Sequence, residues 1–259
     1  MSQQISNLPQ LARLCHAGFV NCVLLEWLAK LLKEFGFEFW FMQYGSVIFD
    51  LDGVILDSMQ SQEWKYRATR EALVELGVDE EYDREVLDAV LGDQGYEECV
   101  RVCGEIGVDP RRAWSRVAEK TSQARMQQIE ENGFGLVDGA EEVLKDLRRN
   151  QMKIGVISNA PDQAVEMVID YFDLRNYFKF FRGVQSFEDL KARKPHPNHL
   201  ELAKFQLKRD PYLYIGDHES DVQAATNANM DSVWVHPENL DEPTYTVESL
   251  QQILDVVEE

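Results

Sequence analysis

The sequence predicts an α/β protein: a doubly wound, Rossmann-like parallel sheet with an inserted helical segment. Two observations indicate the sheet. The apolar run Val47-Ile48-Phe49 lies between Gly45 and Gly53, and from about residue 138 onward short apolar strands alternate with amphipathic helices. This alternation is typical of right-handed strand–helix–strand crossovers with helices on both faces of a sheet. A third observation indicates the insertion, because the pattern is helical from after Ser58 up to about Ile129.

The first strand runs directly into two carboxylates. Asp50 and Asp52 lie one residue apart, after an apolar run that suits a strand buried on both faces. Two ionised carboxylates this close repel each other, so either a cation neutralises them or one of them is protonated. The strand end therefore predicts a metal site or an acid/base pair. The alternative is that the two side chains merely stabilise a turn before Gly53.

The inserted segment is expected to contain four helices, at residues 60–76, 80–90, 95–106 and 110–129. A glycine lies at each break between them. Cys99 and Cys103 are one turn apart on the third helix, where parallel side chains suit packing better than a disulfide. We expect both to be reduced thiols in the core.

Beyond the insertion, the expected strands are residues 153–158, 180–184, 212–215 and 232–235. The expected helices are residues 139–150, 161–171, 197–206, 220–228 and, at the end of the chain, 247–257. Pro161 suits a first helical turn. Each strand is short and mostly apolar, as in a parallel sheet that is covered on both faces.

The first 42 residues lie outside this pattern. Apolar residues recur at helical spacing from Leu24 to Phe35, with charged residues between them, which predicts an amphipathic helix that ends near Gly36. Met42 comes just before the first core strand and would be a natural start for the domain. We therefore interpret residues 1–42 as an N-terminal extension, either an interaction helix or an upstream in-frame segment.

The composition disfavours two classes of partner. Acidic residues outnumber basic ones 46 to 26, which gives a formal net charge of -20. Such a field repels nucleic acid and anionic membrane surfaces. A membrane-spanning helix needs about 18 or more consecutive apolar residues, and neither such a run nor a signal-peptide pattern is present, so we expect a cytoplasmic protein. The expected partner is a small molecule, and the oligomeric state stays open.

Polar side chains also follow the other predicted strands. Ser158 and Asn159 end the second strand, Lys194 follows the third, and Asp217 follows the fourth. Because ligands of doubly wound sheets bind outside the carboxyl ends of the strands, we expect these side chains to meet Asp50 at one edge. A hydroxyl, free amides and an ammonium suit a phosphate, whereas carboxylates suit Mg²⁺.

Each of these residues also has a purely structural interpretation. Asp217 and Asp221 are four residues apart at a helix start, so they share one face and either complete a metal site or cap the helix and complement its dipole. Ser158 and Asn159, before a helix, match a capping pattern as well as an anion site. Lys194 is either a phosphate-binding charge or a solvated loop residue.

Taken together, four motifs in this order after successive strands resemble the haloacid dehalogenase superfamily: Asp50-x-Asp52, Ser158, Lys194 and Gly216-Asp217-x-x-x-Asp221. The resemblance covers residues 46–235, and the helical insertion is similar to the cap of the phosphoglycolate-phosphatase-like branch. It implies a core of residues 43–58 and 136–259, and a cap of residues 59–135.

The resemblance implies a Mg²⁺-dependent phosphatase that hydrolyses a small, phosphoglycolate-like phosphate monoester through an aspartyl-phosphate. Asp50 is then the nucleophile. Asp52 is the acid and base that serves the leaving group and the attacking water. Mg²⁺ is bound by the Asp50 carboxylate, the Asp52 main-chain carbonyl and Asp217.

The resemblance also implies roles for four other residues, which bind the phosphoryl group or position the groups that bind it. Ser158, the Asn159 amide and Lys194 bind the transferring oxygens, and Asp221 orients Lys194 or a metal-bound water. In the cap, the candidates for substrate contact are Trp64, Lys65, Arg67 and Arg70.

Two alternatives stay open. A phosphomutase that acts on a sugar phosphate has the same core and differs in how its cap excludes water. A non-catalytic interaction module that uses the N-terminal helix belongs to another class. A dehalogenase is disfavoured, because the resemblance implies that this activity needs neither an acid at Asp52 nor a metal ligand at Asp217.

Overall fold

The computed structural model describes residues 42–58, 61–78, 81–235 and 243–258. Residues 42–257 belong to one compact unit. The expectations for the N-terminal extension and its amphipathic helix fall on residues 1–41, outside the described residues. The interaction-module alternative rests on the same segment.

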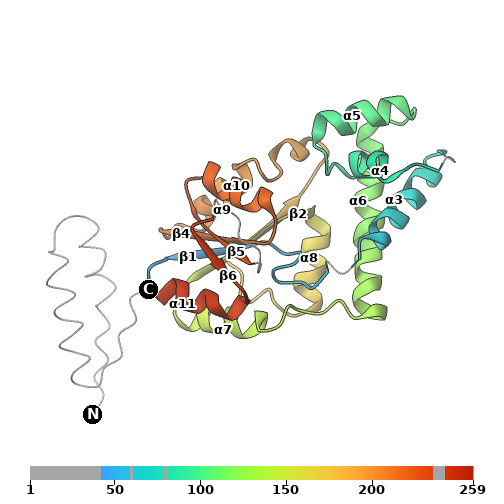
Figure 1. Ribbon diagram of the computed structural model, residues 1–259. Coiled ribbons are helices and arrows are strands. Elements are labelled where there is room, and N and C mark those ends of the chain that lie inside the picture. Colours follow the sequence, from blue (N-terminus) through green and yellow to red (C-terminus); the bar gives the residue numbers. More distant parts are fainter. Residues whose placement is uncertain (1–41, 59–60, 79–80, 236–242, 259) are drawn as a thin grey trace, which may run out of the picture. The chain divides into compact units, whose positions relative to one another are not determined.

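The described chain contains a six-stranded parallel sheet with the strand order β3-β2-β1-β4-β5-β6 (Figure 1). Its strands are β1 (Ser46–Phe49), β2 (Lys153–Pro161), β3 (Phe180–Val184), β4 (Tyr212–Gly216), β5 (Asp231–Val235) and β6 (Tyr245–Val247). Phe49 of β1 pairs with Val156 of β2 on one side and with Ile215 of β4 on the other. The strand order reverses at β1, so Asp50 lies at the topological switch point. The predicted α/β fold class is confirmed.

Helices cover both faces of the sheet. The helices of the core are α7 (Ala140–Arg149), α8 (Asp162–Tyr171), α9 (Asn198–Leu207), α10 (Glu219–Asn227) and α11 (Ile253–Glu258). Ile48 packs in one apolar cluster with residues of α9 and α10, whereas Val47 and Phe49 pack in another with residues of α7, α8 and α11. The side chains of Val47, Ile48 and Phe49 are fully buried, as the apolar run predicts.

The inserted segment is helical, as predicted. It contains α3 (Glu63–Glu75), α4 (Arg84–Leu91), α5 (Tyr96–Glu105) and α6 (Pro110–Gln127) (Figure 1). These helices share a third apolar cluster, which includes Val184, Phe187 and Leu190 from the end of β3 and the residues after it. Cys99 and Cys103 are buried there as free thiols with their sulfurs 4.0 Å apart, so the prediction of core thiols is confirmed for this pair. The division into a core and a cap stays a prediction.

Two chain segments differ from the sequence prediction. The helix expected at residues 247–257 begins later than predicted. Tyr245–Val247 instead forms β6 beside β5, and the helical structure is limited to η3 (Leu250–Gln252) and α11. Three residues are too few for periodicity to reveal a strand. The expected helix at residues 110–129 ends earlier, in a π-helical turn, η1 (Gln128–Asn132).

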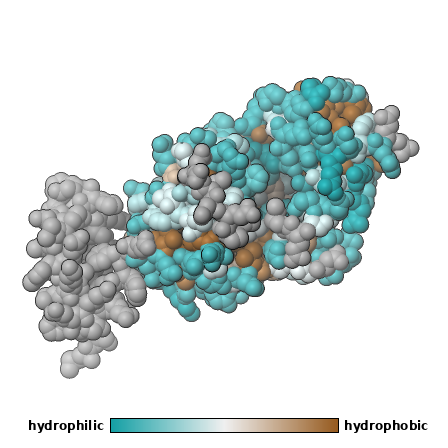
Figure 2. Space-filling model, in the orientation of Figure 1, coloured by the Kyte–Doolittle hydropathy of each residue, from teal (hydrophilic) through white to brown (hydrophobic). Residues whose placement is uncertain are grey.

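The described surface is mostly polar on the side that is drawn. The face seen in Figure 2 is largely hydrophilic. Among the described residues, the model contains no helix that is both long and apolar enough to cross a membrane.

Candidate active site

Asp50 lies where β1 ends, in the middle of the sheet. Its backbone N–H donates to the carbonyl of Ile215 at 2.8 Å, which fixes its position at the carboxyl edge of the strands. The side chain is buried, and its Oδ1 accepts the Leu51 N–H at 2.7 Å and lies 2.9 Å from the Lys194 ammonium. Both contacts fall on Oδ1, so within the described structure Oδ2 is the oxygen left for an incoming group.

Lys194 is buried beside two acids. Its Nζ lies 2.9 Å from Asp50 Oδ1 and 2.5 Å from Asp221 Oδ1, and it donates to the hydroxyl of Tyr214 at 2.8 Å. Burial alone would lower the pKa of Lys194, but the two carboxylates outweigh it and raise the pKa. The ammonium is therefore a permanent positive charge next to Asp50, and its interpretation as a solvated loop residue is wrong.

Asp221 is held by the first turn of α10 and by the lysine. His218 is the N-cap residue, and its N–H donates to Asp221 Oδ2 at 3.0 Å. The other oxygen, Oδ1, faces Lys194 and accepts the Tyr214 hydroxyl at 3.3 Å. The interpretation in which Asp217 caps this helix is therefore wrong, since His218 and Asp221 make the cap.

Gly216 allows Asp221 to approach the end of β4. A Cβ added at Gly216 would lie 2.2 Å from the Cβ of Asp221, so one of the two must move. We expect Gly216→Ala to cost roughly 1–3 kcal/mol of unfolding free energy and to lower any activity of this site about tenfold or more by displacing Asp221 from Lys194. Urea unfolding and steady-state kinetics measure both.

Gly104→Ala is the matched control for this variant. A Cβ added at Gly104 of α5 meets nothing within 4 Å. This control should keep its activity, because alanine is favoured over glycine in a helix. Equal losses in the two variants would show that the close approach at Gly216 has no special role.

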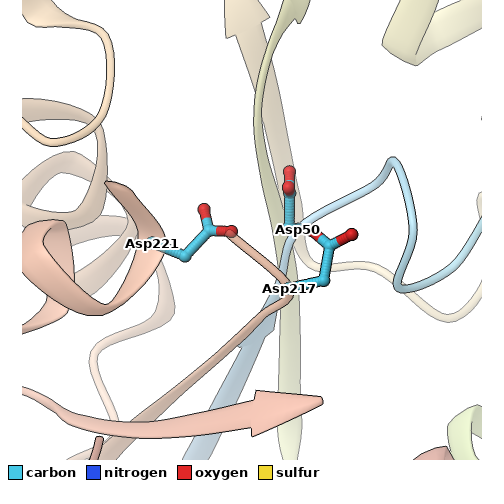
Figure 3. A group of neighbouring side chains, drawn as sticks. All are labelled: Asp50, Asp217 and Asp221. Atoms are coloured by element: carbon cyan, nitrogen blue, oxygen red, sulfur yellow. The ribbon is translucent and has the colours of Figure 1, made fainter. Parts of the chain in front are cut away.

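Asp217 completes a group of three acids with Asp50 and Asp221 (Figure 3). One carboxylate oxygen from each lies within 4.8 Å of the others. Burial and the charge of Asp221 raise the pKa of Asp217 to about 7, and burial raises the pKa of Asp50 well above its usual range against the pull of Lys194. Three carboxylates face one ammonium, so a divalent cation would balance the charge. Oxygen ligands with this excess charge fit a hard divalent metal ion.

The side chain of Asp52 lies outside this acidic group. Its Oδ1 is ion-paired with Arg125 of α6 and accepts a hydrogen bond from the Ser58 hydroxyl at 2.5 Å. Burial alone would raise the pKa of Asp52, but the charge and hydrogen bond of Arg125, together with Ser58, lower it. Arg125 is itself buried, and its guanidinium lies over the ring of Trp64 at 5.2 Å. The Asp52 carboxylate is therefore held ionised by Arg125 of α6 and by Ser58.

Ser158 and Asn159 lie near the end of β2. The buried Ser158 hydroxyl accepts the Ala160 N–H at 3.1 Å. The Asn159 side chain makes two hydrogen bonds to the backbone of Lys194. Its Oδ1 accepts the Lys194 N–H at 2.9 Å, and its Nδ2 donates to the Lys194 carbonyl at 3.1 Å. The helix-cap interpretation is wrong, since Pro161 is the N-cap residue of α8 and no side chain caps this helix. Pro161 thus ends β2 instead of opening the helix.

These side chains line one cavity of about 470 Å³. All seven predicted site residues are among its lining: Asp50, Asp52, Ser158, Asn159, Lys194, Asp217 and Asp221. Trp64 and Lys65 of the inserted segment also line it, whereas Arg67 and Arg70 line a different pocket. The structure therefore brings together the strand-end residues and two of the four candidate substrate contacts.

No sequence motif singles out Arg125, although its position carries a signal. Trp114, Val117, Thr121 and Arg125 recur at helical spacing along α6, and all four are buried. A basic residue on an otherwise apolar or hydroxyl-bearing stripe indicates a buried charge with a fixed partner. That spacing could have identified Arg125.

The sequence and the fold together define the class of protein. A family model for haloacid dehalogenase-like hydrolases matches residues 47–235, well over half of the chain, and the chain belongs to this family. The predicted family and the expectation of a hydrolase are confirmed.

The relatives are similar over most of their length. Phosphoglycolate phosphatases of Vibrio vulnificus and Vibrio parahaemolyticus are 27% and 24% identical over 224 residues, which cover 82% of this chain and 95% of each relative. These names confirm the resemblance to the phosphoglycolate-phosphatase-like branch.

Solved structures share the fold. CbbY from Rhodobacter sphaeroides, in complex with phosphate, is 19% identical with a TM-score of 0.62 and covers 82% of this chain and 96% of that one. A β-phosphoglucomutase from Clostridium difficile is 27% identical with a TM-score of 0.60, covering 81% and 92%.

Proposed function

We propose that the protein is a Mg²⁺-dependent phosphatase that hydrolyses a small phosphate monoester through an aspartyl-phosphate on Asp50. The observation that carries this proposal is the Asp50 carboxylate, held through Oδ1, with the buried Lys194 ammonium 2.9 Å away. An anionic nucleophile can approach a phosphate dianion only where cations offset the repulsion. The names of the curated relatives make phosphoglycolate the reference substrate.

In the first step, Asp50 Oδ2 attacks phosphorus, the bond between phosphorus and the ester oxygen breaks, and the alcohol leaves. This step forms a covalent intermediate on the carboxylate. Lys194 stabilises the charge on the transferring oxygens, while the Ser158 hydroxyl and the Asn159 backbone N–H donate to them. Asp221 keeps the ammonium in place, and its contacts with Lys194 and His218 support this positioning role.

Asp52 serves as the acid and base. Asp52 must first take up a proton from solvent, against its lowered pKa, and it gives this proton to the leaving alkoxide. It is then ionised again and takes a proton from the water that hydrolyses the aspartyl-phosphate, a role that contributes on the order of 10²- to 10⁴-fold. The lowered pKa of Asp52 favours its ionised form, the form that accepts a proton in the second step. Arg125 and Ser58 orient the carboxylate.

The Asp50 and Asp217 carboxylates and the Asp52 main-chain carbonyl would hold Mg²⁺. When bound, the ion neutralises negative charge on the carboxylates and the phosphoryl group, and it orients that group for in-line attack. The negative excess of the acidic group at Asp50, Asp217 and Asp221 supports this assignment.

The test of this function is phosphate release from a generic aryl phosphate by the purified full-length chain. We expect release in the presence of Mg²⁺, loss of release when a chelator removes the metal, and recovery when Mg²⁺ is added back. Release that is unaffected by the chelator would exclude the metal-dependent mechanism.

The affinity for Mg²⁺ should depend on pH near neutrality. The pKa of Asp217 is raised to about 7, and a protonated carboxyl does not bind the metal. Below that pH the proton competes, so we expect the apparent Mg²⁺ affinity to fall by up to about tenfold per pH unit, and to level off above it. Titration calorimetry across this range measures the effect. An affinity that is flat across pH 7 would show that no proton competes with the metal at Asp217 near neutrality.

A phosphomutase is the second candidate, favoured by the likeness to the Clostridium difficile β-phosphoglucomutase. It would use the same Asp50 nucleophile but return the phosphoryl group to a sugar hydroxyl instead of to water. The interconversion of sugar phosphates without net phosphate release would identify it, whereas the phosphatase releases phosphate stoichiometrically.

A further inference from the structure

A fifth aspartate lines the cavity away from the reaction centre. Asp93 follows α4, and its Oδ2 lies 2.8 Å from Lys65 Nζ of α3. Its Oδ1 lies 2.7 Å from Nη2 of Arg193, and Arg193 directly precedes Lys194 in the chain. The charges of these two partners outweigh burial and lower the pKa of Asp93 to about 2, so the carboxylate is ionised at neutral pH.

Each basic side chain of this cavity is ion-paired with an aspartate, although Arg125 Nε and Arg193 Nε have no hydrogen-bond partner among the described residues. Lys65 and Arg193 share Asp93, and Arg193 also donates to the Gly92 carbonyl. Arg125 is ion-paired with Asp52. A second anionic group on the substrate, beyond the phosphate, would therefore compete with Asp93 for Lys65 and Arg193, and their ion pairs would have to be rearranged.

The charge balance points in the same direction. Among the described residues, the lining holds the four aspartates of the reaction centre and Asp93, against the four basic side chains Lys65, Arg125, Arg193 and Lys194, a formal excess of one negative charge. A divalent metal ion and a phosphate dianion cancel each other. A substrate with an uncharged alcohol part leaves that excess unchanged, whereas a carboxylate would add to it.

The inserted helices also give this cavity apolar walls. Trp64, Leu91, Trp114 and Val117 line it, and the two tryptophans are buried. Aromatic and aliphatic walls stabilise carbon surface, and the Trp64 Nε1–H, which has no hydrogen-bond partner among the described residues, can donate to an uncharged oxygen.

We propose that the alcohol part of the substrate is uncharged and has apolar carbon surface, and that Asp93 is a specificity-determining residue that disfavours a carboxylate there. This inference rests on the proposed phosphatase function and names the class of its substrate. It predicts that phosphoglycolate is a poor substrate of this protein.

The first test compares two esters of similar size with the wild-type chain and Mg²⁺. Phosphoglycolate carries a carboxylate, and 2-hydroxyethyl phosphate carries a hydroxyl in its place. We expect kcat/KM to be at least about fivefold higher for 2-hydroxyethyl phosphate, since one unfavourable charge interaction near a protein surface costs on this order. A preference for phosphoglycolate would overturn the inference.

Two variants change the charge in opposite directions. Asp93→Asn removes the competing carboxylate, so the ratio of kcat/KM for phosphoglycolate to that for 2-hydroxyethyl phosphate should rise about fivefold. Lys65→Gln removes a cation, so the same ratio should fall. The ratio cancels the difference in leaving group and any general loss of active enzyme. Glu105→Gln, on an exposed ion pair of α5 with Arg101, is the control and should leave the ratio unchanged.

The outcomes separate this inference from the function on which it rests. If neither ester nor an aryl phosphate releases phosphate, the proposed phosphatase function fails. If phosphate is released but the ratio is the same in Asp93→Asn, Lys65→Gln and wild type, the inference alone is overturned.

Discussion

Asp50→Asn is expected to abolish phosphate release, with kcat reduced by at least roughly 10³-fold. The amide keeps the size of the carboxylate but cannot attack phosphorus to form the intermediate. Burial raises the pKa of Asp50 above its usual range, which means that the ionised carboxylate lowers the folding stability of the metal-free protein. Because the neutral amide of Asn avoids this loss, we expect the variant to be at least as stable as wild type. Steady-state kinetics and urea unfolding measure these two expectations separately.

Asp170→Asn makes the same chemical change on the exposed face of α8, where Asp170 pairs with Arg175. It should leave phosphate release unchanged. If Asp50→Asn released phosphate at a rate near that of wild type, another residue would have to be the nucleophile.

Lys194→Met is expected to damage both stability and activity. It leaves Asp50 and Asp221 without the ammonium that lies 2.9 Å and 2.5 Å from them. Removing one partner of such a buried group costs roughly 3–5 kcal/mol of unfolding free energy. Loss of the charge that stabilises the transferring oxygens should lower kcat by about 10²- to 10³-fold.

The stability loss of Lys194→Met has a definite pH dependence. Burial already raises the pKa of Asp50, and loss of the ammonium raises it further, so the destabilisation is largest where Asp50 would be ionised and shrinks as pH falls. Urea unfolding without Mg²⁺ at neutral and mildly acidic pH measures this. Lys145→Met, on an exposed ion pair of α7 with Glu141, should show little change. A Lys194→Met protein as stable as this control would show that the buried ammonium does not hold the acids together.

The strand-end residues were predictable from sequence because parallel strands place their carboxyl ends at one edge. Short apolar runs located β1 and β4, and the register fixes Asp50 beside the end of β4. Ser158 and Lys194 meet Asp50 in one cavity for the same topological reason. Local spacing was also enough to predict the helices of the inserted segment.

The partners of these residues were not predictable, because they depend on how distant helices pack. Arg125 meets Asp52 across 73 positions of sequence, and Asp93 meets Arg193 across 100. No local pattern encodes such pairs. The side-chain role of Asn159, which brackets the Lys194 backbone, likewise follows from the way two loops meet. β6 was missed because three residues give no period to detect.

The most direct test of the central claim is chemical identification of the phosphorylated residue. In Asp52→Asn the base of the second step is missing, so an aryl phosphate, whose leaving group needs no acid, should load the enzyme faster than water clears it. Acid quenching followed by peptide mass spectrometry should then find one phosphoryl group, on Asp50. A phosphoryl group on any other residue, or a burst of product with no phosphorylated peptide, would contradict the account.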